Sequence, residues 1–357
     1  MSCDGSRPQA EWMDNCKVNM EIVENKSLGK LNTFGLGVNS RYYTELTSRE
    51  DFIEAATLHF HRYPEVLILG GGSNMLFTRD VEGITLAVRN KGIDMADYGR
   101  DEVLLTARAG ENWHELVLFC AREGLSGIEN LAMIPGNAGT APVQNIGAYG
   151  VELKDVFHSL EAFVLGSGEQ IVMSKDECRF AYRDSIFKGE LKNRVLIAAI
   201  TLKLSLKFTP DLSYRGLREH LDVAGISSPS LSQMVEAVCS LRASKLPDPA
   251  VTGNAGSFFK NPVVSIEKHV ELQGRYPDLV SYPQEDGSFK LAAGWLIEQC
   301  GLKGKRLGDA AVHDRQALVL VNHGNASGRE ILRLATLVQS SVMEKFGVNL
   351  EFEVNVI

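Results

Sequence analysis

A glycine-rich turn is the first segment whose residue types could do chemistry. The apolar run at residues 66–69 has the composition of a buried strand, and Gly70-Gly71-Gly72-Ser73-Asn74 follows it directly. Backbone amides in such a turn can approach phosphate oxygens because no side chain stands in the way. Met75 occupies the third glycine position of the dinucleotide fingerprint, which disfavours a nicotinamide Rossmann fold. The segment predicts a phosphate site, although a purely structural tight turn would also explain it.

A second glycine-rich segment covers residues 127–150. Its centre reads Pro135-Gly136-Asn137-Ala138-Gly139, and Gln144-Asn145-Ile146-Gly147-Ala148-Tyr149-Gly150 closes it. The segment fits no regular helix or strand, and long irregular loops in compact domains are usually functional. An exposed linker is the alternative, but its apolar residues would then be wasted. Two phosphate-friendly loops suggest a large dinucleotide between two lobes, and FAD fits this better than a mononucleotide.

Two polar side chains stand where they could act on a bound substrate. Arg183 lies in an expected strand, and an arginine with apolar neighbours there needs an anionic partner. Ser257 ends a glycine-containing turn before two phenylalanines, and no G-x-S-x-G elbow is present, so it would donate a proton rather than attack a carbonyl. A structural salt bridge for Arg183 and a turn serine without a chemical role remain open.

Local patterns predict the elements that position these segments. Strands are expected at residues 103–107 and 195–204, and helices at 112–123, 231–241, 291–300 and 327–347. Ser327 and Glu330 match a capping box, and Gly347 suits a helix C-terminus.

The end of the chain has a different pattern. Residues 350–357 alternate with period two, which would place Glu351, Glu353 and Asn355 on one face of a strand. A shift to polar composition at residues 206–210 marks a candidate domain boundary.

Bulk properties narrow the classes of function. The 357 residues are 44% hydrophobic and 23% charged with a net charge of -8, and no run of Lys or Arg could form a phosphate-backbone stripe, so nucleic acid is not an expected partner. Six scattered cysteines without CxxC spacing, and no signal-like or membrane-length apolar stretch, predict a reduced cytoplasmic chain with no membrane partner. No histidine has partners at metal-ligand spacing, so no metal site is expected.

Taken in order, several of these segments resemble the UDP-N-acetylenolpyruvoylglucosamine reductase family of the bacterial peptidoglycan pathway. The matching blocks are Asn32-Thr33-Phe34, Ile68-Leu69-Gly70-Gly71-Gly72-Ser73-Asn74, Ile134-Pro135-Gly136, Gln144-Asn145-Ile146-Gly147-Ala148-Tyr149-Gly150, Tyr182-Arg183-Asp184-Ser185-Ile186-Phe187, Gly253-Asn254-Ala255-Gly256-Ser257-Phe258-Phe259-Lys260-Asn261-Pro262 and Glu351-Phe352-Glu353-Val354. So many ordered blocks are very specific. Asp211-Leu212-Ser213-Tyr214 also resembles the tyrosine loop of the longer, type I members.

The resemblance implies an α+β protein. It would have a two-lobed FAD-binding domain of the vanillyl-alcohol-oxidase type and a C-terminal α+β substrate domain. The implied parts are an N-terminal extension at 1–26, a first lobe at 27–95 joined by the C-terminal strand 348–357, a second lobe at 96–207 and a substrate domain at 208–347. The extension is expected to be disordered, and the chain is expected to be a monomer.

The resemblance also implies a two-stage reaction. NADPH would reduce FAD and leave, and the enolpyruvyl ether of UDP-N-acetylglucosamine would then take the same site. Flavin N5 would deliver hydride to C3 and a proton would reach C2, which gives UDP-N-acetylmuramate. Arg183 and Glu353 match the family's pair that stabilises the enolate, and Ser257 matches its proton donor.

Further contacts follow from the same resemblance. The implied cofactor-binding residues are Gly70, Gly71, Gly72, Ser73, Asn74, Pro135, Gly136, Gly139, Gln144, Asn145, Gly147, Ala148 and Tyr149. The implied substrate-binding residues are Tyr182, Tyr214, Lys245, Asn261 and Gln299. One departure is Gly71, which stands where relatives often carry an acidic residue.

Two alternatives remain. A flavin-dependent alcohol oxidase of the same superfamily would keep both glycine-rich loops but often carries a histidine for covalent flavin attachment, and neither loop contains one. A flavin or nucleotide-sugar binding protein without turnover would not need Arg183, Ser257 and Glu353 together.

Overall fold

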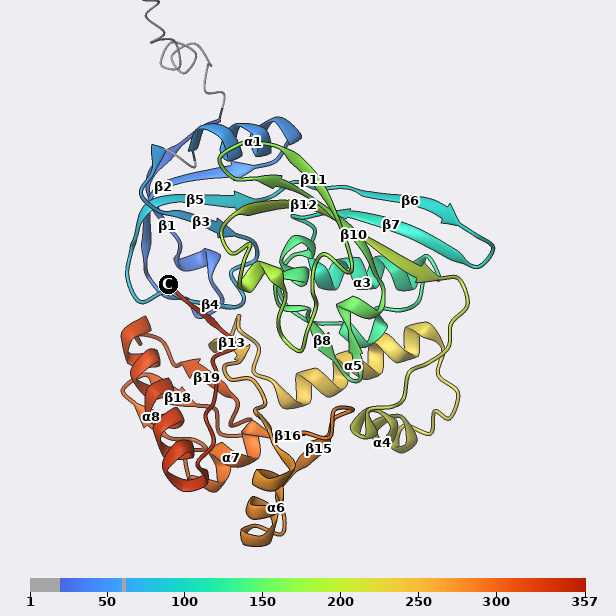
Figure 1. Cartoon of the computed structure of the whole chain (residues 1–357), viewed down its shortest axis with the longest axis vertical. Coiled ribbons are helices and arrows are strands. Elements are labelled where there is room, and N and C mark those ends of the chain that lie inside the picture. The colour runs from blue at the N-terminus through green and yellow to red at the C-terminus, as the bar shows by residue number, and fades with distance from the viewer. Residues whose placement is uncertain (1–19, 60–61) are drawn as a thin grey trace, which may run out of the picture.

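The first lobe is built on a sheet with the strand order β1-β2-β5-β3. The computed structural model describes residues 20–59 and 62–357, in which two sheet-containing lobes lie above a C-terminal domain (Figure 1). The strands of the first sheet are β1 (Val23–Ser27), β2 (Asn39–Leu46), β5 (Val81–Val88) and β3 (Val66–Leu69). Strands β2, β5 and β3 are parallel, and α1 (Arg49–Glu54) with the π-helical turn Ala55–His59 packs against them.

The N-terminal extension is shorter than the sequence predicted. Residues 1–19 lie outside the described residues, but Met20 is buried and β1 pairs antiparallel with β2. The predicted extension at 1–26 is therefore corrected at its C-terminal end. Every residue of β1 is exposed, so this edge strand shows no apolar alternation and is held by ladder hydrogen bonds to β2.

The second lobe contains an antiparallel sheet with the order β11-β10-β12-β7-β6. Its strands are β6 (Ile93–Tyr98), β7 (Glu102–Arg108), β10 (Phe157–Val164), β11 (Gln170–Ser174) and β12 (Val195–Ser205). Helix α3 (Trp113–Arg122) packs on it through Trp113 and Leu116, with the Asn112 side chain as its N-cap. The strands predicted at 103–107 and 195–204 and the helix predicted at 112–123 are confirmed.

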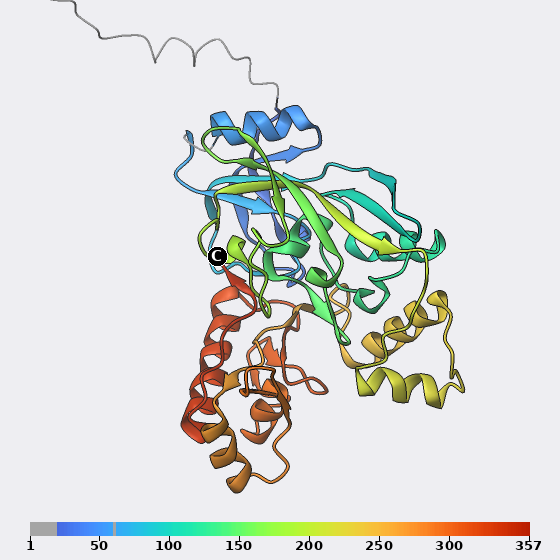
Figure 2. The ribbon, with the colours of Figure 1, turned by 45° about the vertical axis from the view of Figure 1, so that its right-hand side comes forward.

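Two helices of the predicted substrate domain pack on the second lobe instead of the C-terminal domain. They are α4 (Arg215–Val223) and α5 (Leu231–Lys245). Leu217 of α4 and Met234 and Val238 of α5 are fully buried in the same core as β7, β10 and β12. Figure 2 shows the pair below the second lobe, beside the C-terminal domain. The proposed boundary after residue 207 marks where the chain leaves the sheet and does not coincide with the limit of this core.

The C-terminal domain shares its core with the first lobe. Its sheets follow the orders β13-β19-β18-β17 and β14-β16-β15. The strands are β13 (Gly253–Ser257), β14 (Val263–Val264), β15 (Ser281–Pro283), β16 (Phe289–Leu291), β17 (Arg306–Leu307), β18 (Ala310–Val312) and β19 (Val319–Asn322), and the helices are α6 (Ile266–Arg275), α7 (Ala293–Gln299) and α8 (Gly328–Phe346). Phe34 and Phe77 of the first lobe lie in one cluster with Phe258 and Leu334. This shared core fixes the domain against the FAD-binding lobe.

Local caps behave as the sequence predicts. The Ser327 and Glu330 side chains form the predicted capping box on α8, and Gly347 ends the helix with a φ of +63°. None of the helices in residues 20–59 and 62–357 is long and apolar enough to span a bilayer.

Short elements complete the site. They are the strands β4 (Met75–Leu76), β8 (Gly147–Ala148), β9 (Val151–Glu152) and β20 (Asn355–Val356), and the 3-10 turns Gly29–Leu31, Glu129–Leu131, Ala138–Gln144, Leu153–Asp155 and Ile186–Lys188. The irregular segment 127–150 therefore contains two of these 3-10 turns, Glu129–Leu131 and Ala138–Gln144, and the strand β8.

A buried carboxylate supports that segment and makes folding pH-dependent. Glu129 is 7% exposed, and its Oε2 accepts the Gly127 N–H at 2.6 Å. Burial raises the pKa of Glu129, so the folded state keeps this proton to higher pH and loses stability as pH rises above the unfolded pKa of about 4.3. Glu129→Gln keeps an acceptor for Gly127 and should reduce that loss, as measured by urea unfolding of the holoprotein across pH. Glu123→Gln, which changes an exposed carboxylate, is the control. An unchanged pH slope in Glu129→Gln would contradict the assignment.

Candidate active site

The two glycine-rich loops touch each other beside one cavity. A Cβ on Gly70 would come within 2.4 Å of the Thr140 side chain, and a Cβ on Gly71 would come within 2.8 Å of the Gly136 backbone. Any longer side chain at these positions would force the loops apart. The glycines therefore hold two loops from different lobes in contact.

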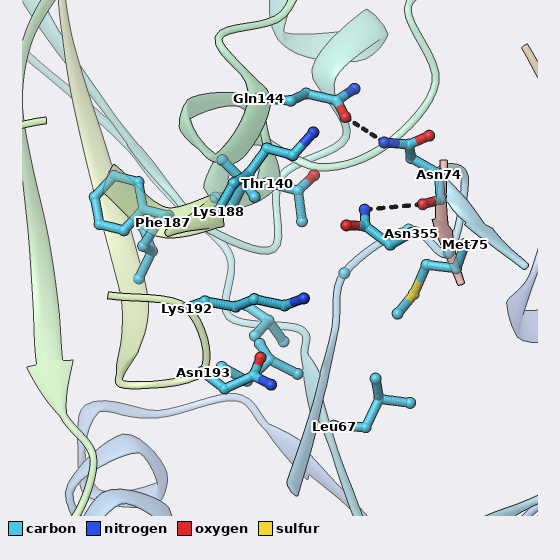
Figure 3. Close-up of a pocket in the computed structure, with 18 of the residues that line it drawn as sticks. Leu67, Asn74, Met75, Thr140, Gln144, Phe187, Lys188, Lys192, Asn193 and Asn355 are labelled. Atoms are coloured by element: carbon cyan, nitrogen blue, oxygen red, sulfur yellow. Dashed lines mark hydrogen bonds between the residues drawn. The ribbon is translucent and has the colours of Figure 1, made fainter. Parts of the chain in front are cut away.

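The cavity has a volume of about 330 Å³, which is within the range of ligand pockets. Of the predicted cofactor residues, Gly70, Gly71, Gly72, Ser73, Asn74, Pro135, Gly139 and Gln144 line it. Figure 3 shows Gln144 and Asn74 hydrogen-bonded to each other at one side. Within the described part of the chain, the backbone amides of Gly71, Gly72 and Ser73 donate to no acceptor. Free amides beside glycines fit the pyrophosphate of FAD.

A substitution at Gly72 tests whether the free amides of this loop bind FAD. It has a φ of +63°, and a Cβ there would lie 1.9 Å from the Leu31 carbonyl oxygen. We expect Gly72→Ala to weaken FAD binding at least roughly tenfold, because backbone strain of about 1–3 kcal/mol would be relieved by moving the loop. Fluorescence titration with FAD measures this. Gly37→Ala, with nothing within 4 Å of the added carbon, is the matched control, and equal affinities in both variants would argue against binding by these amides.

Arg183 lies in a tight turn, so its predicted place in a strand is wrong. Ala181 and Asp184 exchange backbone hydrogen bonds of 3.0 and 3.2 Å around it, and its φ is +53°. The strand prediction failed because the chain reverses between Ala181 and Asp184, which pair with each other across the turn. The turn directs Arg183 at Gly147, whose carbonyl oxygen accepts its Nη2–H, and a Cβ on Gly147 would lie 2.8 Å from Nη1. Gly147 is thus needed for the arginine's approach.

Arg183 reaches two carboxylates. Its Nε lies 3.3 Å from Glu353 Oε1, and its Nη1 lies 3.7 Å from Glu152 Oε1. The Arg183 and Glu353 side chains are only 18% and 14% exposed. Burial raises the pKa of Glu353, while Arg183, Lys188 and Lys260 oppose that rise. The salt-bridge alternative is therefore partly true. Neither residue lines the cavity, but the Glu353 carbonyl accepts a hydrogen bond from Nδ2 of Asn74, which does.

Glu353 is not in the regular strand that was predicted for residues 350–357. Only β20 is a strand there, pairing with β4, and the chain bends at Glu353. The Glu353 N–H donates to the Phe258 carbonyl at 2.9 Å, and Phe352 forms an isolated antiparallel β-bridge with Phe259. This pairing brings Glu353 beside the residue that follows Ser257.

Ser257 ends strand β13, where it pairs with Val319 of β19. Gly256 before it has a φ of +69°, and its N–H donates to Asn254 Oδ1 at 2.9 Å. The Ser257 side chain is half-buried, and its hydroxyl has no hydrogen-bond partner among residues 20–59 and 62–357. This free hydroxyl belongs to the residue next to Phe258, whose carbonyl accepts the Glu353 N–H.

Aromatic residues and cations form the outer part of the site. Lys290 Nζ lies 4.5 Å from the centre of the Tyr182 ring. Burial raises the pKa of Tyr182, and the nearby Asn261 opposes that rise. Asn261 Oδ1 in turn accepts the Ala293 N–H at the start of α7. Tyr182 and Asn261, both predicted to bind substrate, therefore lie close together, and their role stays a prediction.

The tyrosine loop packs against the second glycine-rich segment. The Tyr149 and Tyr214 rings meet edge to face at 5.1 Å, and Lys245 Nζ lies 5.7 Å from the Tyr214 ring centre. The predicted Tyr214 and Lys245 therefore lie together, next to a residue predicted to bind the cofactor.

Some predicted residues lie elsewhere. Gln299 is exposed at the last turn of α7, the opposite end from Asn261, and its carbonyl oxygen accepts the Lys345 Nζ–H. Asn145 is fully buried and donates to Glu152 and Ala181, so it supports the loop. Gly136, Gly147, Ala148 and Tyr149 do not line the cavity either.

Sequence reasoning missed other cavity residues. Thr140, Lys188, Lys192 and Asn193 line the cavity. Lys188 directly follows the motif at residues 182–187, so the sequence could have indicated it as a site residue. Within the described part of the chain, no three His, Cys, Asp or Glu side chains form a group that could hold a metal ion.

Comparison with known proteins identifies the family of the chain and an FAD binding domain within it. Residues 248–357 match the family model described as UDP-N-acetylenolpyruvoylglucosamine reductase, C-terminal domain, and residues 41–174 match an FAD binding domain. A UDP-N-acetylenolpyruvoylglucosamine reductase of Pseudomonas savastanoi pv. phaseolicola is 47% identical over 336 residues, covering 94% of this chain and 99% of that protein. One from Chromobacterium violaceum is 49% identical over 323 residues, covering 90% and 95%.

A solved structure has the same fold. UDP-N-acetylenolpyruvylglucosamine reductase (MurB) from Thermus caldophilus superimposes with a TM-score of 0.65 at 26% identity, covering 95% of this chain and 98% of that chain. The α+β fold expected from the sequence, with an FAD-binding domain and a C-terminal domain, is confirmed, and so is FAD as the cofactor.

Proposed function

The chain belongs to the UDP-N-acetylenolpyruvoylglucosamine reductase family, and from this premise we propose that it reduces the enolpyruvyl ether of UDP-N-acetylglucosamine to UDP-N-acetylmuramate with electrons from NADPH. The observation that carries the proposal is the Arg183–Glu353 pair beside the Ser257 segment. Asn74, which lines the glycine-lined cavity, joins the pair to it by donating its Nδ2–H to the Glu353 carbonyl. Bound FAD would supply a hydride that it has taken from NADPH.

Arg183 and Glu353 would stabilise the charge that develops on the substrate. Hydride addition at C3 leaves negative charge shared between C2 and the carboxylate, and a half-buried guanidinium stabilises such charge better than water does. Because burial raises the pKa of Glu353, this carboxyl holds a proton at higher pH than an exposed glutamate. A protonated Glu353 would donate a hydrogen bond to an enolate oxygen.

Ser257 would complete the reaction by giving its hydroxyl proton to C2. A serine is a weak acid in water, so the step needs a strongly basic enolate and a dry site. The absence of any protein partner for its hydroxyl within the described residues leaves that proton free to transfer.

The outer residues would hold the nucleotide parts. Tyr214 and Lys245 offer a phenol and an ammonium to the diphosphate of the sugar nucleotide. Tyr182 and Asn261 lie on the Arg183 side and would contact the nicotinamide or the sugar. Both substrates would thus use one site in turn.

The proposed product is a peptidoglycan precursor. The activity would therefore serve cell-wall synthesis in the cytoplasm and, through it, cell shape and division.

Anaerobic stopped-flow absorbance at the flavin band tests the proposal. NADPH should bleach the band, and the enolpyruvyl sugar nucleotide should restore it. Bleaching without recovery would keep the flavoprotein and reject the substrate. Bleaching by a primary or secondary alcohol instead of NADPH, with recovery on addition of O₂ and not of the sugar nucleotide, would favour the oxidase alternative.

A further inference from the structure

Lys188 is a cation in the cavity that the mechanism above does not use. It ends the 3-10 turn Ile186–Lys188, and its side chain is half-buried. Figure 3 shows its amino group pointing toward the Gln144–Asn74 pair. The amino group donates one hydrogen bond, to the Arg183 carbonyl at 3.4 Å.

The protein provides little compensation for this charge. No carboxylate in residues 20–59 and 62–357 lies within 4.0 Å of Lys188 Nζ, and its single hydrogen bond is long. Burial lowers the pKa of Lys188, and Lys260 lowers it further, while Glu353 opposes them. An ammonium has three donors, so its remaining donors face the cavity. An anionic occupant of the cavity would compensate for the cost of placing a cation there.

Lys188 lies at the end of the cavity nearest the Arg183–Glu353 pair. Asn74 Nδ2 donates to the Glu353 carbonyl at 3.2 Å as well as contacting Gln144. Lys192 lies at the other end of the labelled residues, with Asn193 and Leu67 (Figure 3). If the proposed function holds, the redox-active ring must lie at the Glu353 end, and the phosphates and adenosine must extend away from it.

We propose that Lys188 sets the reduction potential of the bound FAD, by placing its ammonium against the redox-active ring. A hydride delivers two electrons and one proton, so the ring gains one negative charge and the nicotinamide gains one positive charge. A fixed cation beside the ring stabilises that added charge and so favours the reduced state. Lys192, by contrast, would bind the phosphates, whose charge is the same in both redox states.

A thermodynamic distinction separates these two roles. A group that stabilises only the reduced cofactor changes the ratio of the affinities for reduced and oxidised FAD, and hence the potential. A group that contacts the phosphates changes both affinities equally and leaves the potential unchanged. Lys188→Met removes the charge with little change in volume, Lys188→Arg keeps the charge, and Lys192→Met is the matched control on the same loop.

The experiment measures the midpoint potential of FAD in each holoprotein by anaerobic reduction against a reference dye, together with the dissociation constant for oxidised FAD. Lys188→Met should reduce the preference for reduced FAD about tenfold, which is a downward shift of about 30 mV for a two-electron couple. Lys188→Arg should keep most of the potential, and Lys192→Met should weaken FAD binding with the potential unchanged.

Each outcome decides the proposal. A wild-type potential in Lys188→Met would overturn it, and so would an equal shift in Lys188→Arg, because the charge would then not matter. If Lys188→Met fails to retain FAD, the potential is read from Lys188→Gln in the same way. No sugar nucleotide enters the measurement, so failure of the proposed substrate and failure of this inference are seen separately.

Discussion

Replacing Ser257 by alanine should leave flavin reduction by NADPH nearly unchanged and slow reoxidation by the sugar nucleotide by roughly 10²–10⁴-fold, the range for loss of a general acid. The two half-reactions separate because hydride transfer from NADPH needs no proton at C2 of the sugar. The Ser257 hydroxyl has no other role to lose, since it makes no hydrogen bond within the described residues.

Single-turnover stopped flow measures the two steps separately. Ser257→Cys is the informative companion variant, because a thiol can still donate a proton from nearly the same place and should recover part of the rate. Normal reoxidation in Ser257→Ala would remove this residue from the mechanism. An equal loss in both half-reactions would instead indicate a damaged FAD site.

Replacing Arg183 by glutamine should slow reoxidation by the sugar nucleotide about 10²–10³-fold, as loss of one preorganised donor to a developing oxyanion does. Glutamine retains a donor but loses the charge that faces Glu353 at 3.3 Å. The loss should appear in the rate at saturating substrate, because the charge develops only during the reaction.

Arg179→Gln is the matched control for this variant. Arg179 is in the same segment and also has a positive φ, but its ion pair with Glu190 is about two-thirds exposed on both sides, and exposed pairs contribute little. The two variants are compared by kcat and by the reoxidation rate. A similar loss in both would show that any charge change in this segment is damaging, and would leave Arg183 without a specific role.

Residues whose environment is local could be predicted from the sequence. The Ser327–Glu330 capping box needs only residues within one helical turn, and Gly347 needs only its own backbone freedom. The first glycine-rich loop was recognisable for a similar reason, because a turn that exposes amides to a ligand has to be made of glycines. Strand β1 has no such pattern in its sequence, because all its residues are exposed and only its backbone pairing with β2 attaches it to the sheet.

The residue types of the site were determined by the sequence, and their arrangement was decided by the tertiary structure. Glu353 stands out as a charge between Phe352 and Val354, and Arg183 lies within a recognisable motif, but their 3.3 Å contact joins residues far apart in the chain. That contact depends on a turn at Arg183 and a bend at Glu353, where local patterns predicted strands. Propensities sum over neighbours in sequence, whereas Arg183 and Glu353 also make hydrogen bonds to Gly147 and Phe258, which are neighbours only in space.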